Sequence, residues 1–294
     1  MKLFISKTLF VGIIAFAFLV AFKLILPENK NYNSAFVNKL DILISHTQER
    51  KIVLIGGSSV GHGISAEQIQ NATHLTTINL GHHAGFGLVD FRDLVLSTIN
   101  KDDIIVFAPE WEFYANPIYF DTATLEDLYN NSHYLELTKN PNYKSFKSLI
   151  LKKTGIINSL IPNHSPCRYD CYNNNGDIIS TCGAKPLSIT DYSVCFDYFN
   201  YELFSNTFPF INRPNTLIVF PPTQKRVYSR CRKQFDFIET QLFKTKLLIL
   251  DSASANVYDE SCFFDAEYHL SCENRILRTN KIIPKLIELM KISN

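Results

Sequence analysis

The chain has 294 residues, a formal net charge of +1, 19% charged residues and 46% hydrophobic ones. After a short N-terminal segment is set aside, that length supports one large domain with a substantial core. The near-neutral charge, with no long basic run and no interleaving of basic and aromatic residues, argues against nucleic acid as a partner.

The N-terminus has the pattern of a membrane anchor. Two lysines precede an uncharged run at residues 8–22, and apolar character continues past Lys23 to Pro27. A bilayer core takes about twenty apolar residues, and the Lys23 side chain can reach the interface to complete the span. We expect residues 1–28 to be an uncleaved single-pass anchor in the inner (cytoplasmic) membrane, with its N-terminus in the cytoplasm and the remaining chain periplasmic or otherwise extracytoplasmic. The alternative is a cleaved signal peptide, but the Ala-Phe-Ala at residues 15–17 lies inside the run.

Residues 29–50 are expected to form a stalk and a lead-in helix, and residues 51–294 an α/β domain. Within the domain, Ser65 is a predicted helix cap. Apolar runs predict strands and amphipathic spacing predicts helices. Their alternation predicts a parallel sheet with helices on both faces. The predicted strands are residues 51–55, 75–80, 103–108, 216–220 and 246–250, and the later helices are residues 225–243 and 273–291.

A serine turn follows the first of these strands. The run at residues 51–55 breaks into Gly-Gly-Ser-Ser at residues 56–59. Glycine tolerates positive φ, so this turn can bend sharply and present Ser58 at the carboxyl edge of the sheet. A serine nucleophile needs a base in hydrogen-bond reach and a group that orients the base, and His269 and Asp265 are residues of those types. The alternative is that the serines only cap the next helix.

Periodicity fades in the middle of the chain, which predicts an irregular insertion at about residues 115–214 that selects the substrate. An oxidising compartment would form at most three bridges from seven cysteines. A bridge between Cys262 and Cys272 would restrain the segment around His269. A zinc site on the first four cysteines is the alternative, although none of them forms a Cys-x-x-Cys pair. The cysteines are Cys167, Cys171, Cys182, Cys195, Cys231, Cys262 and Cys272.

Four short blocks resemble the SGNH (GDSL-type) hydrolase superfamily, and in particular its membrane-anchored bacterial branch that edits or acylates envelope polymers. The blocks are the strand with Gly-Gly-Ser-Ser, the Gly-Ile that follows it, Asn-Leu-Gly at residues 79–81, and a late Asp and His-Leu before the last helix. The resemblance implies a flavodoxin-like three-layer sandwich. It also implies that Ser58 is the nucleophile, His269 the base and Asp265 the acid that orients it.

The resemblance further implies that backbone N–H groups of Gly81 and of the turn, at Ser59, hold the oxyanion. Ser59 is also an alternative nucleophile, because a Gly-Asp-Ser pattern fits when shifted by one residue. Asp265 lies four residues before His269, whereas the family usually has three, so Glu267 is an alternative acid. No Asn stands in the expected place after the third strand.

Several other residues lie near the same predicted edge. His82 and His83 are expected to shape the substrate pocket. Glu110 and Glu112 follow the third strand, where one glutamate can form a hydrogen bond in the place of the family's Asn. As a pair they would also suit glycosidase chemistry, which leaves the serine turn unexplained. Together with His62, Asp265 and His269, the two histidines could be considered metal ligands, but they have no metal-binding spacing, so neither a metal nor a cofactor is expected.

The expected function is that of a membrane-anchored serine esterase or O-acyltransferase. It would act on acyl groups, acetyl above all, of an envelope polysaccharide or glycolipid through an acyl-serine intermediate. A multi-spanning membrane protein that transports acyl groups is the expected partner of a transferase. The alternative is an inactive SGNH-like protein that binds glycan or assists polymer assembly. The missing Asn favours the alternative, because an oxyanion donor contributes on the order of 3 kcal/mol.

Overall fold

The computed structural model describes residues 12–14, 35–89, 92–118, 171–183, 195 and 198–292. Contacts divide the chain into two units, Met1–Lys30 and Asn31–Asn294. Apart from helical residues 12–14, the predicted anchor lies outside the described residues. Within the ranges given, no helix is long and apolar enough to cross a membrane.

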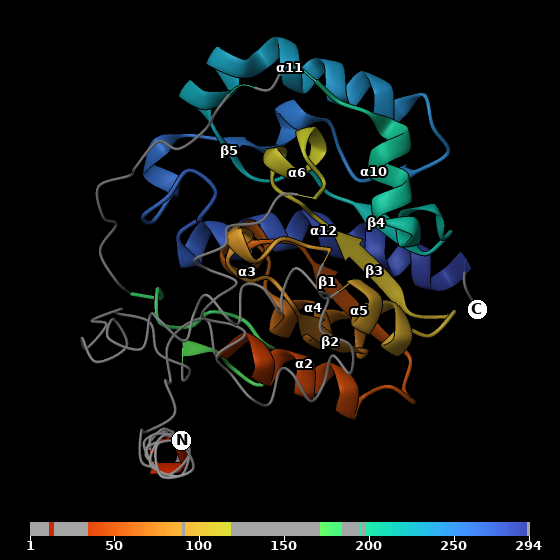
Figure 1. Ribbon diagram of the computed structural model, residues 1–294. Helices are drawn as coiled ribbons and strands as arrows, with labels where there is room; N and C mark the ends of the chain where they lie inside the picture. The colour runs from red at the N-terminus through yellow and green to blue at the C-terminus, as the bar shows by residue number, and fades with distance from the viewer. Residues whose placement is uncertain are drawn as a thin grey trace, which may run out of the picture. The chain divides into compact units, whose positions relative to one another are not determined.

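A five-stranded parallel sheet forms the centre of the second unit (Figure 1). Its order is β2-β1-β3-β4-β6, so the predicted α/β class with a central parallel sheet is confirmed. The order is consistent with a flavodoxin-like sheet, in which successive connections diverge between β1 and β3. The strands are β1 (Lys51–Ile55), β2 (Thr76–Asn79), β3 (Ile104–Phe107), β4 (Thr216–Ile218) and β6 (Leu248–Ile249), each within its predicted run.

The described helices follow the predicted alternation. α11 has the bounds that the amphipathic spacing predicted, and Ser65 caps α4 by accepting the Gln68 N–H at 3.3 Å. The α-helices are α2 (Ala35–Ser45), α3 (Ser58–Gly63), α4 (Ala66–Thr73), α5 (Arg92–Thr98), α6 (Trp111–Ala115), α10 (Tyr201–Thr207), α11 (Lys225–Phe243) and α12 (Cys272–Ile292). Short 3-10 helices are η1 (Ala84–Phe86), η4 (Pro209–Asn212), η5 (Ala253–Asn256) and η6 (Glu260–Cys262). The sequence did not predict the small parallel pair β5 (Thr223–Gln224) and β7 (Val257–Tyr258).

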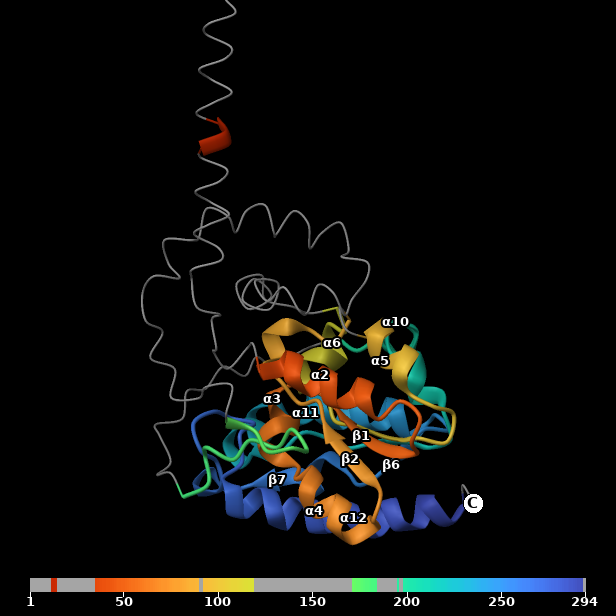
Figure 2. The same ribbon diagram turned by 90° about the horizontal axis from the view of Figure 1, so that it is seen from below.

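Both faces of the sheet are covered, which explains why β1 is apolar and buried along its whole length. Alternate β1 residues enter different hydrophobic clusters: Val53 and Ile55 the first, Ile52 and Leu54 the second. The first cluster includes side chains of α2, α5, α6, α10 and α11, and the second those of α3, α4 and α12. Figure 2 shows α4 and α12 on one side of the sheet and α2, α5 and α10 on the other.

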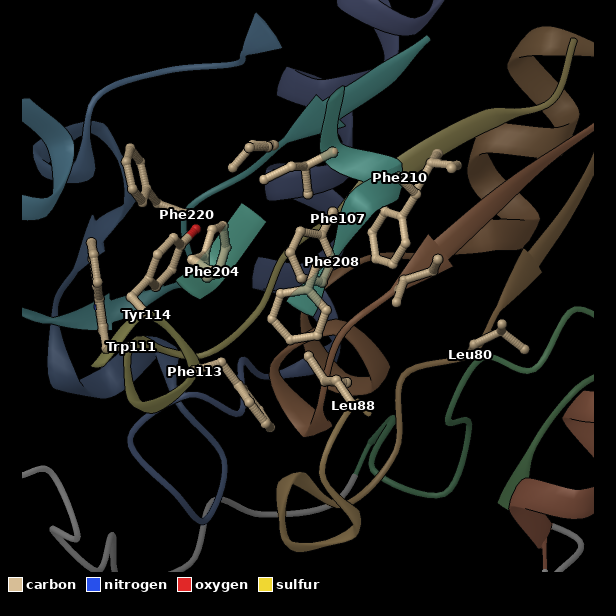
Figure 3. Close-up of a cluster of buried hydrophobic side chains, with 14 of the residues drawn as sticks. Leu80, Leu88, Phe107, Trp111, Phe113, Tyr114, Phe204, Phe208, Phe210 and Phe220 are labelled. Atoms are coloured by element: carbon tan, nitrogen blue, oxygen red, sulfur yellow. The ribbon is translucent and has the colours of Figure 1, made fainter. Parts of the chain in front are cut away.

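Aromatic rings fill much of the first cluster (Figure 3). The Phe107 ring at the end of β3 lies 5.1 Å from that of Phe208 and 5.0 Å from that of Phe210. The Trp111 ring at the start of α6 stacks 4.1 Å from that of Phe235 on α11. This packing fixes the segment that leaves β3, which is one wall of the candidate site described below.

Disulfides tie separate parts of the second unit together. Cys182 bonds to Cys272 and Cys195 to Cys231, and Cys171 is also disulfide-bonded. Cys262 is a free thiol, so the predicted bridge between Cys262 and Cys272 is wrong. The observed bridge joins the start of α12 to residues 171–183, a described part of the predicted insertion. These bonds are compatible with an oxidising compartment.

Candidate active site

The serine turn connects β1 to α3 at the carboxyl edge of the sheet. In Figure 1, α3 and α6 follow the carboxyl ends of β1 and β3, the two strands at which the connections diverge. Ligands of open α/β sheets bind in the crevice at this position. Ser58, the first residue of α3, is partly exposed there.

The two turn glycines are needed for close approach of other groups. A Cβ on Gly56 would collide with the Ala108 carbonyl, and one on Gly57 with the Glu110 carboxylate. Neither glycine has a positive φ, so the conformational reason expected from the sequence is wrong. The turn is tight because the segment after β3 packs directly against it.

Glu110 holds this turn from the neighbouring strand. Its carboxylate accepts the Gly57 N–H at 3.1 Å and the Ser59 N–H at 2.8 Å, and the residue is 1% exposed. Burial raises the pKa of Glu110, whereas the hydrogen bonds from the two amides act in the opposite direction. The carboxylate thus clamps the amides on both sides of Ser58.

Ser59 is fully buried, and its hydroxyl donates to the Ala108 carbonyl oxygen at 3.3 Å. Its N–H is engaged with Glu110. By contrast, neither the hydroxyl nor the N–H of Ser58 has a hydrogen-bond partner within the described ranges. Of the two serines, Ser58 is therefore the one whose groups are available to a substrate.

Gly81 lies directly against α3. A Cβ at this position would collide with the backbone of Gly61, so only glycine fits. The Gly81 N–H donates to Asn79 Oδ1 at 2.9 Å, and its carbonyl accepts from Lys39 Nζ. Both amides expected to hold an oxyanion, those of Ser59 and Gly81, are thus engaged in hydrogen bonds inside the protein.

Asp265 and His269 form a close pair in the loop that precedes α12. Asp265 Oδ1 lies 2.6 Å from His269 Nδ1. The backbone turns between them, with the Phe264 N–H donating to the His269 carbonyl at 2.7 Å and the His269 N–H to the Ala266 carbonyl at 3.2 Å. This turn accommodates the four-residue spacing and makes Asp265, not Glu267, the partner of His269. The pairing at Nδ1 leaves Nε2 as the nitrogen available for proton transfer.

His62 connects this pair to the serine helix. Its ring stacks on that of His269, with centroids 3.9 Å apart and planes 12° apart. His62 follows Ser58 by four residues on α3, and side chains with this spacing lie on the same helix face. Because His269 stacks on His62, the Asp265–His269 pair lies beside α3, the helix that begins with Ser58. No hydrogen bond joins Ser58 to His269 among the described residues, as is common when a substrate is absent.

Burial is the main reason that the pKa of His62 is well below its usual value, and the nearby His269 and Arg275 add to the effect. His62 is therefore neutral at physiological pH. It is 7% exposed, and its Nδ1 is buried without a hydrogen-bond partner among the residues that the structure describes. The sequence argument considered His62 only as a metal ligand and so missed this contact, although its spacing from Ser58 is visible in the sequence.

Glu112 and Glu110 do not act as one carboxylate pair. Glu112 accepts the Tyr268 hydroxyl at 3.0 Å, whereas Glu110 binds the serine turn. Burial, with a smaller contribution from Glu110, raises the pKa of Glu112 to about 8. The different partners of the two side chains give no support to glycosidase chemistry.

The two later histidines have different surroundings. His82 is 1% exposed, with its ring 4.4 Å from Phe36 and 5.3 Å from Phe86, and it lies in the core instead of lining a pocket. Burial lowers the pKa of His82 to about 3. His83 is exposed, and its Nδ1 accepts the Gly85 N–H at 3.0 Å. Across the described ranges, no group of histidine, cysteine and acidic residues is arranged to hold a metal ion.

Two buried arginines of α12, Arg275 and Arg278, lie behind the site. Arg278 is 1% exposed and donates to the carbonyl oxygens of Phe220 at 2.8 Å and Ser59 at 3.5 Å. Burial lowers the pKa of Arg278 to about 10. Arg275 donates to the Ile178 carbonyl and contacts the sulfur of Cys182 at 3.4 Å.

Residues 171–183 brace the site from outside the sheet. The buried carboxylate of Asp177 accepts the Ala66 N–H at 2.8 Å, the Glu67 N–H at 2.9 Å and the Asn79 side-chain amide at 2.9 Å. Because Asn79 in turn holds the Gly81 N–H, Asp177 supports the loop against α3. The Asn-Asn-Asn-Gly-Asp turn, with Gly176 at φ 82°, was the only sequence signal for this contact.

Comparisons with known proteins leave the family open: no family model, curated protein or solved structure matches the chain.

Proposed function

We propose that the protein is a serine esterase or O-acyltransferase that works through an acyl-Ser58 intermediate. The observation that carries the proposal is the stack of His62 on His269, since it brings the Asp265–His269 pair to the face of α3 that presents Ser58. The strand order and the base in the loop before the last helix support an SGNH-like fold.

In the proposed reaction, Ser58 Oγ attacks the ester carbonyl carbon while His269 Nε2 takes its proton. Asp265 holds Nδ1 and stabilises the imidazolium that forms. The tetrahedral intermediate collapses as the bond to the leaving alcohol breaks and His269 returns the proton to that alcohol. Water or a sugar hydroxyl then attacks the acyl-enzyme, its proton passes to His269, and Ser58 leaves with that proton.

An oxyanion requires donors that are free to receive it. The Ser58 N–H is the first candidate, because it has no partner among the described residues. The amides of Ser59 and Gly81 can contribute only if they leave Glu110 and Asn79. We therefore place the Ser58 N–H at the centre of the proposed oxyanion hole.

The proposed setting is the extracytoplasmic face of the inner membrane, with the chain anchored by its N-terminal segment. The disulfides support an oxidising compartment, and the uncharged run in the sequence supports the anchor. The proposed acceptor or substrate is an O-acylated envelope polysaccharide or glycolipid, and the proposed partner is a membrane protein that delivers acyl groups.

The test is intact-mass analysis of the full chain, purified in detergent, after treatment with a fluorophosphonate. We expect one adduct on wild type, which Ser58→Ala abolishes. Ser59→Ala is the matched control for the adjacent serine, and its folding is verified by thermal denaturation. A folded wild type without an adduct, or an adduct that persists in Ser58→Ala, contradicts the proposal.

A non-catalytic role in glycan binding or polymer assembly is the second candidate. The observation that favours it is the engagement of the Ser59 and Gly81 amides, together with the absence of an Asn after β3 in the sequence. In that case the folded wild type forms no adduct. It should still bind envelope polysaccharide, and Ser58→Ala should bind it equally well.

A further inference from the structure

His62 is the residue of the site whose presence the proposed reaction does not explain. It takes no proton in the steps above, and its pKa keeps it neutral. Within the described part of the chain, its Nδ1 makes no hydrogen bond, so the polar contacts that usually account for a buried histidine do not explain it. The interaction that joins its ring to the site is the parallel stack on His269.

The hydrogen bond from His269 Nδ1 to Asp265 leaves the orientation of the His269 ring incompletely defined. It fixes the direction of Nδ1, but the ring can still rotate about the line joining Nδ1 to the carboxylate. The side chains of Asp265 and His269 are 35% and 17% exposed, so neither is fully enclosed by protein. Rotation would move Nε2 away from the face of α3 that carries Ser58.

A flat ring stacked on His269 removes that freedom. The planes of the two imidazoles differ by only 12°, and His62 is itself a buried residue of α3, 7% exposed. His62 is on the same short helix as Ser58, so it ties the plane of the base to the position of the nucleophile.

We propose that His62 is a positioning residue that fixes the ring plane of His269 relative to Ser58, an inference that rests on the proposed function. His62 does this with its flat face and not with its nitrogens. Asp265 then sets which nitrogen faces the nucleophile, and His62 sets the plane in which that nitrogen lies.

Two substitutions of His62 separate the effect of a planar ring from the effect of a buried apolar side chain. His62→Phe keeps a planar ring without nitrogens, and His62→Leu keeps an apolar side chain without a plane. We expect fluorophosphonate labelling of His62→Phe to stay within about threefold of wild type and that of His62→Leu to fall at least about tenfold, since small misplacements of reacting groups are costly. The labelling rate of His62→Leu should stay low even at the pH where the wild-type rate no longer rises, because the substitution changes the position of His269 and not its protonation. His46→Ala, on the surface, is the control for removing a histidine.

The second measurement does not depend on activity. NMR signals of the His269 ring protons, assigned by their loss in His269→Gln, should show contacts that define one ring orientation in wild type and His62→Phe and an average over several orientations in His62→Leu. Thermal denaturation should show both variants folded. If either fails to fold, His62→Tyr and His62→Met provide a second planar and non-planar pair.

The possible results are distinguishable. Labelling of His62→Leu at the wild-type rate, or equal loss in the planar and non-planar variants, overturns the inference. If folded wild type is not labelled, the proposed function fails and the NMR signals alone decide on His62. Unchanged His269 signals in His62→Leu then overturn the positioning role, whereas averaged signals support it.

Discussion

Glu110 accepts the N–H of Ser59 across the gap between β3 and the serine turn, at 2.8 Å. Since it also accepts the Gly57 N–H, one carboxylate from the segment after β3 fixes both amides that flank Ser58. The two strands are neighbours in the sheet, so the clamp joins the two loops that meet at its crevice.

Removal of this clamp should destabilise the protein and the site together. Glu110→Ala leaves two buried amides without an acceptor, which should lower the free energy of unfolding by about 2–4 kcal/mol. Urea denaturation measures this change, and Ser58 labelling should slow in parallel. Glu288→Ala is the control: Glu288 is exposed and paired only with Lys285, so less than about 0.5 kcal/mol is expected. Equal stability of the two variants would show that Glu110 does not hold the turn.

The Asp265–His269 contact makes a second prediction. Asp265→Asn should reduce the labelling rate by about 10³–10⁴-fold, because an amide in place of the carboxylate favours the wrong imidazole tautomer. The rate is measured by intact mass over time, at a temperature well below the denaturation midpoint of each protein. Glu267→Gln is the comparison, because His269 pairs with Asp265 and not with Glu267. A slow Glu267→Gln beside a fast Asp265→Asn would assign the acid to Glu267.

Much of the sheet could be predicted from the sequence because its strands are continuous apolar runs. Residues 51–55 and 104–107 are buried on both faces, and such segments are recognisable without knowledge of their partners. The helix at residues 225–243 was predicted with its correct ends because apolar residues recur every three or four positions along one face of it. β5 and β7 have two residues each, which is too short for any periodicity to show.

The residue types of the candidate site could be recognised in the sequence, but the contacts that support them could not. Ser58, His269 and Asp265 could be chosen because their chemistry is distinctive. By contrast, the contact of Asp177 with α4 joins residues more than a hundred positions apart, and the turn sequence before Asp177 does not indicate its partner. Arg278 likewise has the sequence context of an exposed helix residue, and only the packing of α12 against α3 and α4 shows that it is buried.

Asp177 gives a third prediction, on the support of the site from residues 171–183. Asp177→Ala removes acceptors from the N-terminus of α4 and from Asn79, and should lower the free energy of unfolding by about 3 kcal/mol. Asp259→Ala removes a carboxylate that is 73% exposed and 4.0 Å from Lys225, so less than about 0.5 kcal/mol is expected. Chemical denaturation of both variants makes the comparison. A small effect of Asp177→Ala would mean that the segment contributes little to the folded state.

Lys39 gives the last prediction, on the dependence of stability on pH. It is 1% exposed, with its ammonium at the Gly81 carbonyl and 4.1 Å above the Tyr172 ring. Burial lowers the pKa of Lys39 to about 7, with Asp177 partly opposing the shift. Below pH 7 the lysine is charged in both folded and unfolded states, and the full cost of burying the charge is present. As the pH rises from about 7 towards 10.5, the folded protein loses the proton first and that cost is relieved.

Stability should therefore rise with pH in this window, by at most about 1.4 kcal/mol per pH unit from Lys39 alone. Lys39→Met removes the titration, so the difference in unfolding free energy between wild type and the variant should change steadily between pH 7 and pH 9. Other titrating groups are common to both proteins and cancel in that difference. Lys285→Met is the matched control, because Lys285 is a surface lysine paired with Glu288. A difference that stays constant across this range would show that Lys39 keeps its proton in the folded protein. The Gly81 carbonyl and Asp177 would then stabilise the buried ammonium group.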